Sequence, residues 1–133
     1  MSYILIHNGS SQKEKNYPYF EQVAEILIAK GYNVKWVENK TIKELVETIK
    51  DCSVFIGNDS GPMHIADYYR KPIVLLIGPT FYPKNLPYFS KYVVVRNNFC
   101  KRGCYLKTYC GKCLMVDPML IIRETEKLLK ENY

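Results

Sequence analysis

Apolar residues are distributed along this chain in two alternating patterns. Short, nearly unbroken apolar runs are typical of strands in a parallel sheet, and they occur at residues 3–7, 33–37, 54–57, 73–77 and 92–95. Elsewhere apolar positions recur at helical spacing: at 19–30, in a short segment capped by Thr41, at 61–70, and from about Pro118 onward. Strands that alternate with helices predict an α/β fold with right-handed crossovers. We therefore expect a three-layer Rossmann-like domain around a parallel sheet of about five strands.

Length and composition indicate one domain of ordinary size, over residues 1–133, with a Cys-rich loop at 97–114. No apolar run approaches the roughly 20 residues of a membrane span. The first seven residues lead directly into a strand and lack the basic segment of a signal peptide, so we expect a cytoplasmic protein. The formal net charge of +6 is compatible with an anionic ligand or surface and selects neither.

The junction after the third predicted strand carries the most informative chemistry. Asp59 and Ser60 are helix N-cap types, and after Gly61 comes Pro62, which suits a first helical turn. A strand that turns directly into a helix N-terminus presents free N–H groups and the positive end of the helix dipole, an arrangement that binds phosphate. His64 can add a donor from the same turn. Strand–helix junctions without a ligand use similar residues, so the spacing alone leaves both interpretations open.

A second polar loop follows the first predicted strand. Gly9 permits close approach of the backbone, Ser10 supplies a hydroxyl donor, and Lys15 is a suitable counter-charge for a phosphate. Taken alone, this loop also fits a solvated surface segment. The two loops follow parallel strands, so both lie at the carboxyl edge of the sheet, where ligands of such sheets bind. They therefore support each other as a phosphate site.

Four segments give the chain a resemblance to a known family. They are LIHNGS with the following KNYP (residues 5–10 and 15–18), FIGNDSGPMHIA (55–66), KPIVLLIGPT (71–80), and the Cys-containing loop that leads through CLM to Pro118. These segments resemble the C-terminal, donor-binding half of the heptosyltransferases, glycosyltransferase family nine, which have the two-domain GT-B architecture. The second segment resembles the family's most specific signature almost residue for residue, whereas Tyr17 stands where the family has Trp.

The resemblance implies a site for the diphosphate of a nucleotide sugar such as ADP-heptose, whose sugar is transferred to lipopolysaccharide or another glycan acceptor. The residues implied as diphosphate contacts are Ser10, Lys15, Ser60, Gly61, Met63 and His64, and those that shape the loops are Gly9, Asp59 and Pro62. Asp59 is expected to cap the helix, because a carboxylate beside a diphosphate would repel it. No cofactor is required, since a helix N-terminus with Lys and His stabilises the leaving nucleoside diphosphate.

The chain also departs from the family. A family enzyme has an N-terminal half that binds the acceptor and supplies the general base, so no catalytic residue is assigned here. The stretch between 37 and Thr41 is shorter than in the family, where an acidic residue serves the nucleoside. We therefore expect a donor-binding domain whose acceptor face comes from a separate chain or a second copy. UDP-sugar epimerases share the Asp-Ser-Gly turn but usually carry Glu further along that helix rather than His64, which makes them the weaker resemblance.

Four cysteines near the C-terminus follow the spacing C-x3-C-x5-C-x2-C: Cys100, Cys104, Cys110 and Cys113. Four thiolates this close can form a tetrahedral structural zinc site, although the spacing is not that of a standard double C-x2-C knuckle. Reduced thiols fit the sequence as well as zinc does, and disulfides are disfavoured in an ordinary cytosol. Cys52, just before a predicted strand, is expected to be a small buried hydrophobe.

Two other functions remain open. One is a non-catalytic module that binds a nucleotide or nucleotide sugar. The other is a basic zinc knuckle that binds nucleic acid through the Cys-rich loop and its aromatic residues Phe99, Tyr105 and Tyr109. The junction at 59–66 favours donor binding over nucleic acid, because a nucleic-acid module has no need of it.

Overall fold

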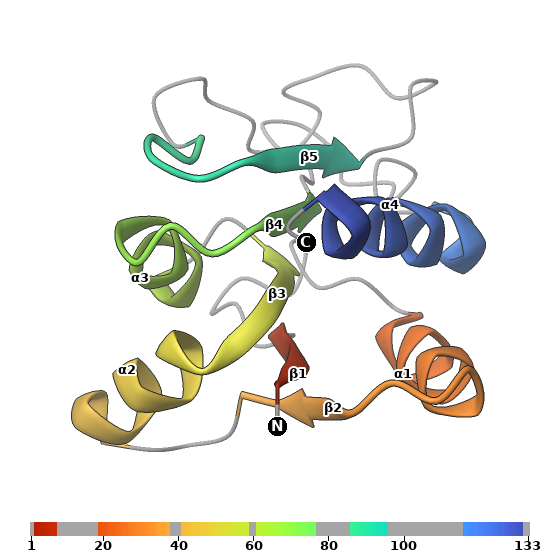
Figure 1. Ribbon diagram of the computed structural model, residues 1–133, viewed down its shortest axis with the longest axis horizontal. Coiled ribbons are helices and arrows are strands. Elements are labelled where there is room, and N and C mark those ends of the chain that lie inside the picture. The colour runs from red at the N-terminus through yellow and green to blue at the C-terminus, as the bar shows by residue number, and fades with distance from the viewer. Residues whose placement is uncertain are drawn as a thin grey trace, which may run out of the picture.

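The computed structural model of the chain describes residues 2–7, 19–37, 41–58, 61–76, 86–95 and 116–131. These residues form five strands and four helices that alternate as the apolar pattern predicts (Figure 1). In chain order they are β1 (Tyr3–His7), α1 (Phe20–Ala29), β2 (Val34–Trp36), α2 (Ile42–Lys50), β3 (Cys52–Asn58), α3 (Gly61–Tyr68), β4 (Ile73–Leu76), β5 (Tyr92–Val95) and α4 (Pro118–Glu131).

The five strands form one sheet in the order β2-β1-β3-β4-β5, and every neighbouring pair is parallel. In the register, Ile4 of β1 pairs with Val34 of β2 on one side and with Val54 of β3 on the other. The predicted α/β fold and parallel five-stranded sheet are thereby confirmed. From β1 the chain passes to β2, which is the edge strand of the sheet. It then crosses to β3, which lies on the other side of β1.

Helices cover both faces of the sheet, with α1 and α4 on one face and α2 and α3 on the other (Figure 1). Alternation along β1 divides the core accordingly, because Ile4 and Ile6 face α1 and α4 whereas Leu5 faces α2 and α3. Burial on both faces explains why β1 and β4 are unbroken apolar runs. The fully buried members include Phe20, Leu27, Ile56, Val74 and Ile122 on the first face and Ile49, Phe55, Met63, Ile73 and Leu75 on the second.

Two helix ends close in the same way with different residues. After α1, Gly31 has φ +96, and the N–H of Tyr32 donates to the carbonyl of Leu27. After α3, Arg70 has φ +59, and the N–H of Lys71 donates to the carbonyl of Ala66. Both are Schellman-type ends, in which the residue after the helix is left-handed. The prediction that α3 continues to Arg70 is corrected to an end at Tyr68 for this reason.

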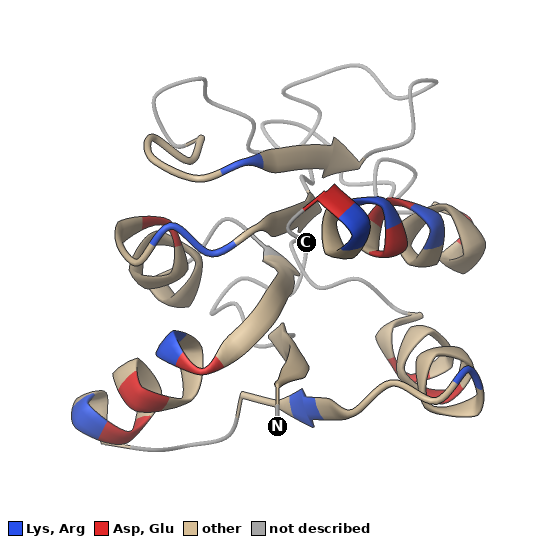
Figure 2. Cartoon of the chain, viewed as in Figure 1, with Lys and Arg blue, Asp and Glu red and all other residues tan. Residues whose placement is uncertain are grey.

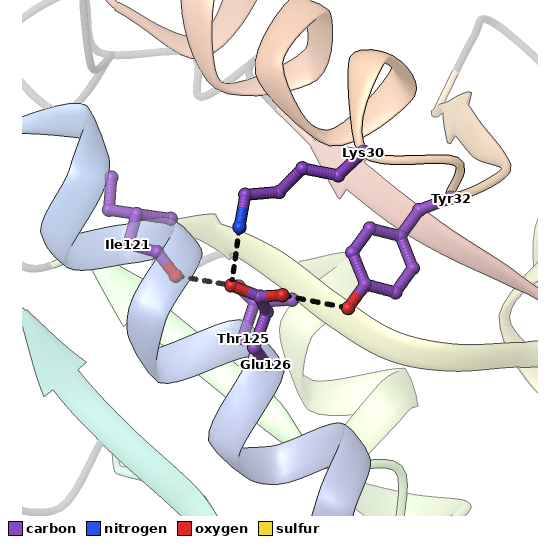
Figure 3. A network of polar contacts seen from close by, with 5 residues as sticks. All are labelled: Lys30, Tyr32, Ile121, Thr125 and Glu126. Carbon is purple, nitrogen blue, oxygen red and sulfur yellow. Dashed lines mark hydrogen bonds and ion pairs between the residues drawn. The ribbon is translucent and has the colours of Figure 1, made fainter.

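A polar network joins α1 to α4 across the outer layer. Glu126 of α4 accepts hydrogen bonds from the Nζ of Lys30, at 3.1 Å, and from the hydroxyl of Tyr32, at 2.9 Å (Figure 3). The hydrogen bond from Tyr32, with that from Lys30, holds the pKa of Glu126 below its ordinary value. The network ties the segment before β2 to the last helix of the chain.

Candidate functional site

The carboxyl ends of β1 and β3 lie side by side, because His7 pairs with Gly57 in the register. The strand order places β2 on one side of β1 and β3 on the other, so this pair is the topological switch point of the sheet. In open parallel sheets of this order, ligands bind at the switch point, outside the carboxyl ends of the strands. The two loops that the sequence assigns to phosphate binding follow β1 and β3, so both begin at this point.

The N-terminus of α3 follows the end of β3 after only two residues, 59 and 60. The first N–H groups of a helix have no intrahelical acceptor, and the helix dipole is positive there. Gly61, the first residue of α3, is exposed. Apart from its chain neighbours and the backbone of its own helix, no heavy atom of the described residues lies within 4 Å of the position that a Cβ on Gly61 would take. Among the described residues, none blocks the close approach of an anion to the backbone at this helix end.

Of the two predicted contacts in the first turn of α3 that carry a side chain, His64 faces solvent and Met63 faces the core. His64 is exposed, so its imidazole is available beside the helix N-terminus. Met63 is fully buried in the cluster with Phe55 and Leu75. Any contact of Met63 with a ligand therefore comes from its backbone N–H. Pro62 occupies the first turn as predicted, where the N–H that it lacks has no helical partner to lose.

Several predicted residues fall outside the described part of the chain. They are Gly9, Ser10, Lys15, Asp59, Ser60 and the four cysteines Cys100, Cys104, Cys110 and Cys113. Their roles stay predictions. Within the described ranges, no three or more His, Cys, Asp or Glu side chains are grouped so as to hold a metal ion. Cys52 is buried as expected, although it begins β3 rather than preceding it, and burial raises the pKa of its thiol to about 12.

His7, the last residue of β1, has no predicted role from the sequence. Its side chain is only 8% exposed, and its ring stacks on Phe55 with 6.4 Å between ring centroids. Burial lowers the pKa of His7, which keeps the imidazole neutral near pH 7. A Cβ on Gly57 would lie 2.8 Å from the Phe55 ring and 3.2 Å from the His7 carbonyl oxygen. Close packing at the switch point thus involves His7, Phe55 and Gly57. The sequence signal for His7 is that it is a polar residue at the end of an apolar run, just before a Gly-Ser loop.

Two cavities outlined by the described residues lie away from this edge. One of about 470 Å³ is bordered by Tyr3, Gly31, Ser53 and Glu126, at the amino ends of β1 and β3. The switch point and the helix N-terminus locate the candidate donor site more directly than this cavity does. The loops that would wall the donor site, 8–18 and 59–60, lie outside the described residues.

The profile of glycosyltransferase family 9 (heptosyltransferase) matches residues 38–113, more than half of the chain. The chain belongs to this family. It is 33% identical over 119 residues to "Lipooligosaccharide heptosyltransferase 2" of Campylobacter jejuni serotype O:2, a match that covers 84% of this chain and 37% of that protein. The chain thus spans little more than a third of the length of this relative.

Solved structures share the fold. Escherichia coli ADP-heptose lipopolysaccharide heptosyltransferase II superposes with a TM-score of 0.81 at 22% identity, covering 98% of this chain and 47% of that one. The dodecameric iron-containing heptosyltransferase TibC, solved in complex with ADP-D-β-D-heptose, gives a TM-score of 0.76 at 19% identity, with coverage of 98% and 45%. Among the described residues of our chain, no helix has the length and apolar character needed to cross a membrane.

Proposed function

We propose that this chain is the donor-binding domain of a heptosyltransferase-type enzyme and that it binds the diphosphate of a nucleotide sugar of the ADP-heptose class. The observation that carries the proposal is the N-terminus of α3, open at Gly61 and flanked by exposed His64, beside the β1–β3 switch point. In this proposal the backbone N–H groups of α3 and the His64 imidazole bind the diphosphate. Ser10, Lys15 and Ser60 complete its shell from the two neighbouring loops.

The proposed site suits a transfer that needs no metal. As the bond from the sugar to the diphosphate breaks, negative charge develops on the leaving nucleoside diphosphate. A helix N-terminus with a Lys and a His stabilises that charge as it forms. Support for ADP-heptose as the donor comes from TibC, which shares the fold and was solved with that sugar nucleotide.

Transfer to a lipopolysaccharide or other glycan acceptor is proposed to require an acceptor-binding half. That half would correspond to the N-terminal domain of a GT-B enzyme. A second candidate function is a module that binds the nucleotide sugar without turnover. The two proposals share the donor site and differ in whether glycosyl transfer follows.

Calorimetric titration of the chain with ADP, UDP, GDP and their sugar conjugates tests the donor site. We expect saturable binding of one nucleotide class and a loss of about 1–3 kcal/mol in His64→Ala, the range of a lost hydrogen bond to a charged group. Lys43→Ala, an exposed change on α2, is the matched control and should bind like the wild type. Absence of binding to every nucleotide, or equal binding by His64→Ala, would contradict the proposed site.

A further inference from the structure

Exposed aromatic side chains and cations gather at the amino ends of β4 and β5, at the opposite end of the sheet from the candidate donor site. Tyr68, Tyr88 and Phe89 are 69%, 87% and 55% exposed. Arg70 and Lys71 lie in the connection from α3 to β4, the blue segment between those two elements in Figure 2. We call the surface formed by these five residues the aromatic–basic face.

The backbone that carries these aromatic residues is held in place. Asp67 of α3 accepts hydrogen bonds from the N–H groups of Tyr88 and Phe89, at 2.7 and 2.8 Å, and of Ser90, at 2.9 Å. The guanidinium of Arg70 lies 5.9 Å from the centre of the Phe89 ring. The rings are therefore presented to solvent on a fixed support. Exposed aromatic surface that a protein holds in place in this way is typical of an interaction site.

A cavity of about 280 Å³ lies beside Arg70, whose guanidinium also lies near the Phe89 ring. Its lining includes Arg70, Lys71, Tyr69 and the hydroxyl-bearing Ser53. Within the described part of the chain, neither Arg70 nor Lys71 forms an ion pair, whereas Lys91 nearby is paired with Glu131 at 3.0 Å. The cavity thus has on its wall two cations that no carboxylate of the described residues neutralises, and it suits a single phosphate group.

We propose that the aromatic–basic face docks on an anionic phospholipid surface, with a lipid phosphate in the cavity at Arg70 and Lys71 and the rings of Tyr88 and Phe89 at the interface. Aromatic side chains favour the headgroup level of a bilayer, and cations are attracted to its anionic lipids. The proposal does not depend on the proposed donor function. Docking at this end of the sheet leaves the β1–β3 switch point facing away from the lipid.

The charge pattern favours a bilayer over a nucleic acid. A nucleic-acid strand needs a groove of cations that follows its backbone. On α2 and α4, however, cations alternate with carboxylates (Figure 2). The two cations of the aromatic–basic face stand beside one cavity and an aromatic patch, a combination that fits one headgroup and the surrounding lipid interface.

Sedimentation of the full chain with lipid vesicles tests this proposal. Vesicles of equimolar phosphatidylglycerol and phosphatidylcholine should remove the chain from the supernatant, whereas vesicles of phosphatidylcholine alone should not. The double variant Arg70→Gly/Lys71→Ala should partition about tenfold less. Tyr88→Ser/Phe89→Ser should also partition less, because both rings are exposed and both backbone N–H donors to Asp67 are retained.

Matched controls come from exposed residues on other elements. Ile28→Ser/Ile42→Ser removes apolar surface of 57% and 78% exposure from α1 and α2, and Lys43→Ala removes a cation from α2. Both controls should sediment like the wild type. Equal sedimentation with neutral vesicles, or no effect of the face variants, would overturn the proposal. So would tighter binding of a single-stranded oligonucleotide, or self-association of the chain, that the same face variants abolish.

Discussion

The carboxylate of Asp67 lies 2.7 Å from the backbone nitrogen of Tyr88, a residue 21 positions later in the chain. The same side chain accepts hydrogen bonds from the N–H groups of Phe89 and Ser90, so one buried carboxylate fixes the segment that precedes β5. Burial raises the pKa of this carboxyl, but the hydrogen bonds from these three N–H groups outweigh burial and hold the pKa below its ordinary value of 3.8. The hydrogen bonds by which Asp67 joins α3 to the segment before β5 are therefore strongest while its carboxyl is ionised.

Replacement of Asp67 by Ala should lower the free energy of unfolding by about 2–3 kcal/mol, because three N–H groups lose a charged acceptor. In the wild type, the contribution of Asp67 is fully present above the unfolded-state pKa near 3.8 and is lost as the pH falls through the lower folded-state pKa. Urea unfolding at a series of pH values should show this acid-dependent loss, and Asp67→Asn should reduce it. Asp51→Asn, at an exposed carboxyl, is the control. An undiminished loss in Asp67→Asn would refute the assignment.

The left-handed backbone of Arg70 predicts a stabilising substitution. A non-glycine residue with φ +59 carries a steric cost that glycine avoids. Arg70→Gly should therefore raise the free energy of unfolding by about 1 kcal/mol. Gly31→Ala, at the equivalent end of α1 with φ +96, should lower it by a similar amount. Urea denaturation measures both changes, and a destabilised Arg70→Gly would mean that the side-chain contact with Phe89 outweighs the backbone cost.

The strands and their layering were predictable because burial on both faces leaves an unbroken apolar run. The predicted strand boundaries at 3–7 and 92–95 coincide with β1 and β5. The end of α3 was not predictable, since Arg70 takes a conformation for which the sequence shows no glycine. Contacts between residues far apart in the chain were not predicted either. Nothing in the local sequence indicates that Asp67 accepts hydrogen bonds from residues 88–90, because that pairing depends on the positions of α3 and β5 in the finished sheet.

The candidate site was predictable in its place and less so in its individual side chains. Loops after β1 and β3 were expected at one edge, and the register that pairs His7 with Gly57 brings their starting points together. Motif position alone did not separate Met63 from His64, although helical geometry turns the first into the core and the second to solvent. His7 escaped because its burial depends on Phe55 of a neighbouring strand.

Metal analysis tests the predicted zinc site. If Cys100, Cys104, Cys110 and Cys113 coordinate zinc, the chain purified without chelator should hold about one zinc ion, and Cys110→Ser should lose it. Cys52→Ala is the matched control. This substitution should leave the zinc content unchanged, because the Cys52 thiol is buried in the core. A metal-free wild type with titratable thiols would contradict the zinc prediction and leave the reduced cysteines in its place.

The buried imidazole of His7 predicts a second pH dependence, at a higher pH than that of Asp67. Burial lowers the folded-state pKa of His7 below the ordinary value of 6.5, so the unfolded chain binds the proton more readily. The stability that neutral His7 contributes is fully present above about pH 6.5 and is lost as the pH falls through the folded-state pKa. His7→Gln should flatten this part of the stability profile in urea unfolding. His64→Gln, at the exposed histidine, should leave the profile as it is. A profile that is flattened by His64→Gln and unchanged by His7→Gln would contradict the prediction.

Two glycines near the switch point should differ in how much stability the same substitution costs. Gly57→Ala should lower the free energy of unfolding by about 1–3 kcal/mol, because the added Cβ would lie 2.8 Å from the Phe55 ring and neighbouring atoms must shift. Gly61→Ala adds a Cβ where the described residues leave open space, so stability should stay within about 1 kcal/mol of the wild type.

Nucleotide binding separates the roles of these glycines further. Under the proposed function, the methyl group in Gly61→Ala intrudes where the diphosphate approaches the first turn of α3, and affinity for ADP should fall by about tenfold. Calorimetric titration beside urea unfolding measures both quantities on the same samples. A Gly61→Ala variant that binds ADP like the wild type would show that the ligand does not approach this helix end, even if the fold and its switch point are intact.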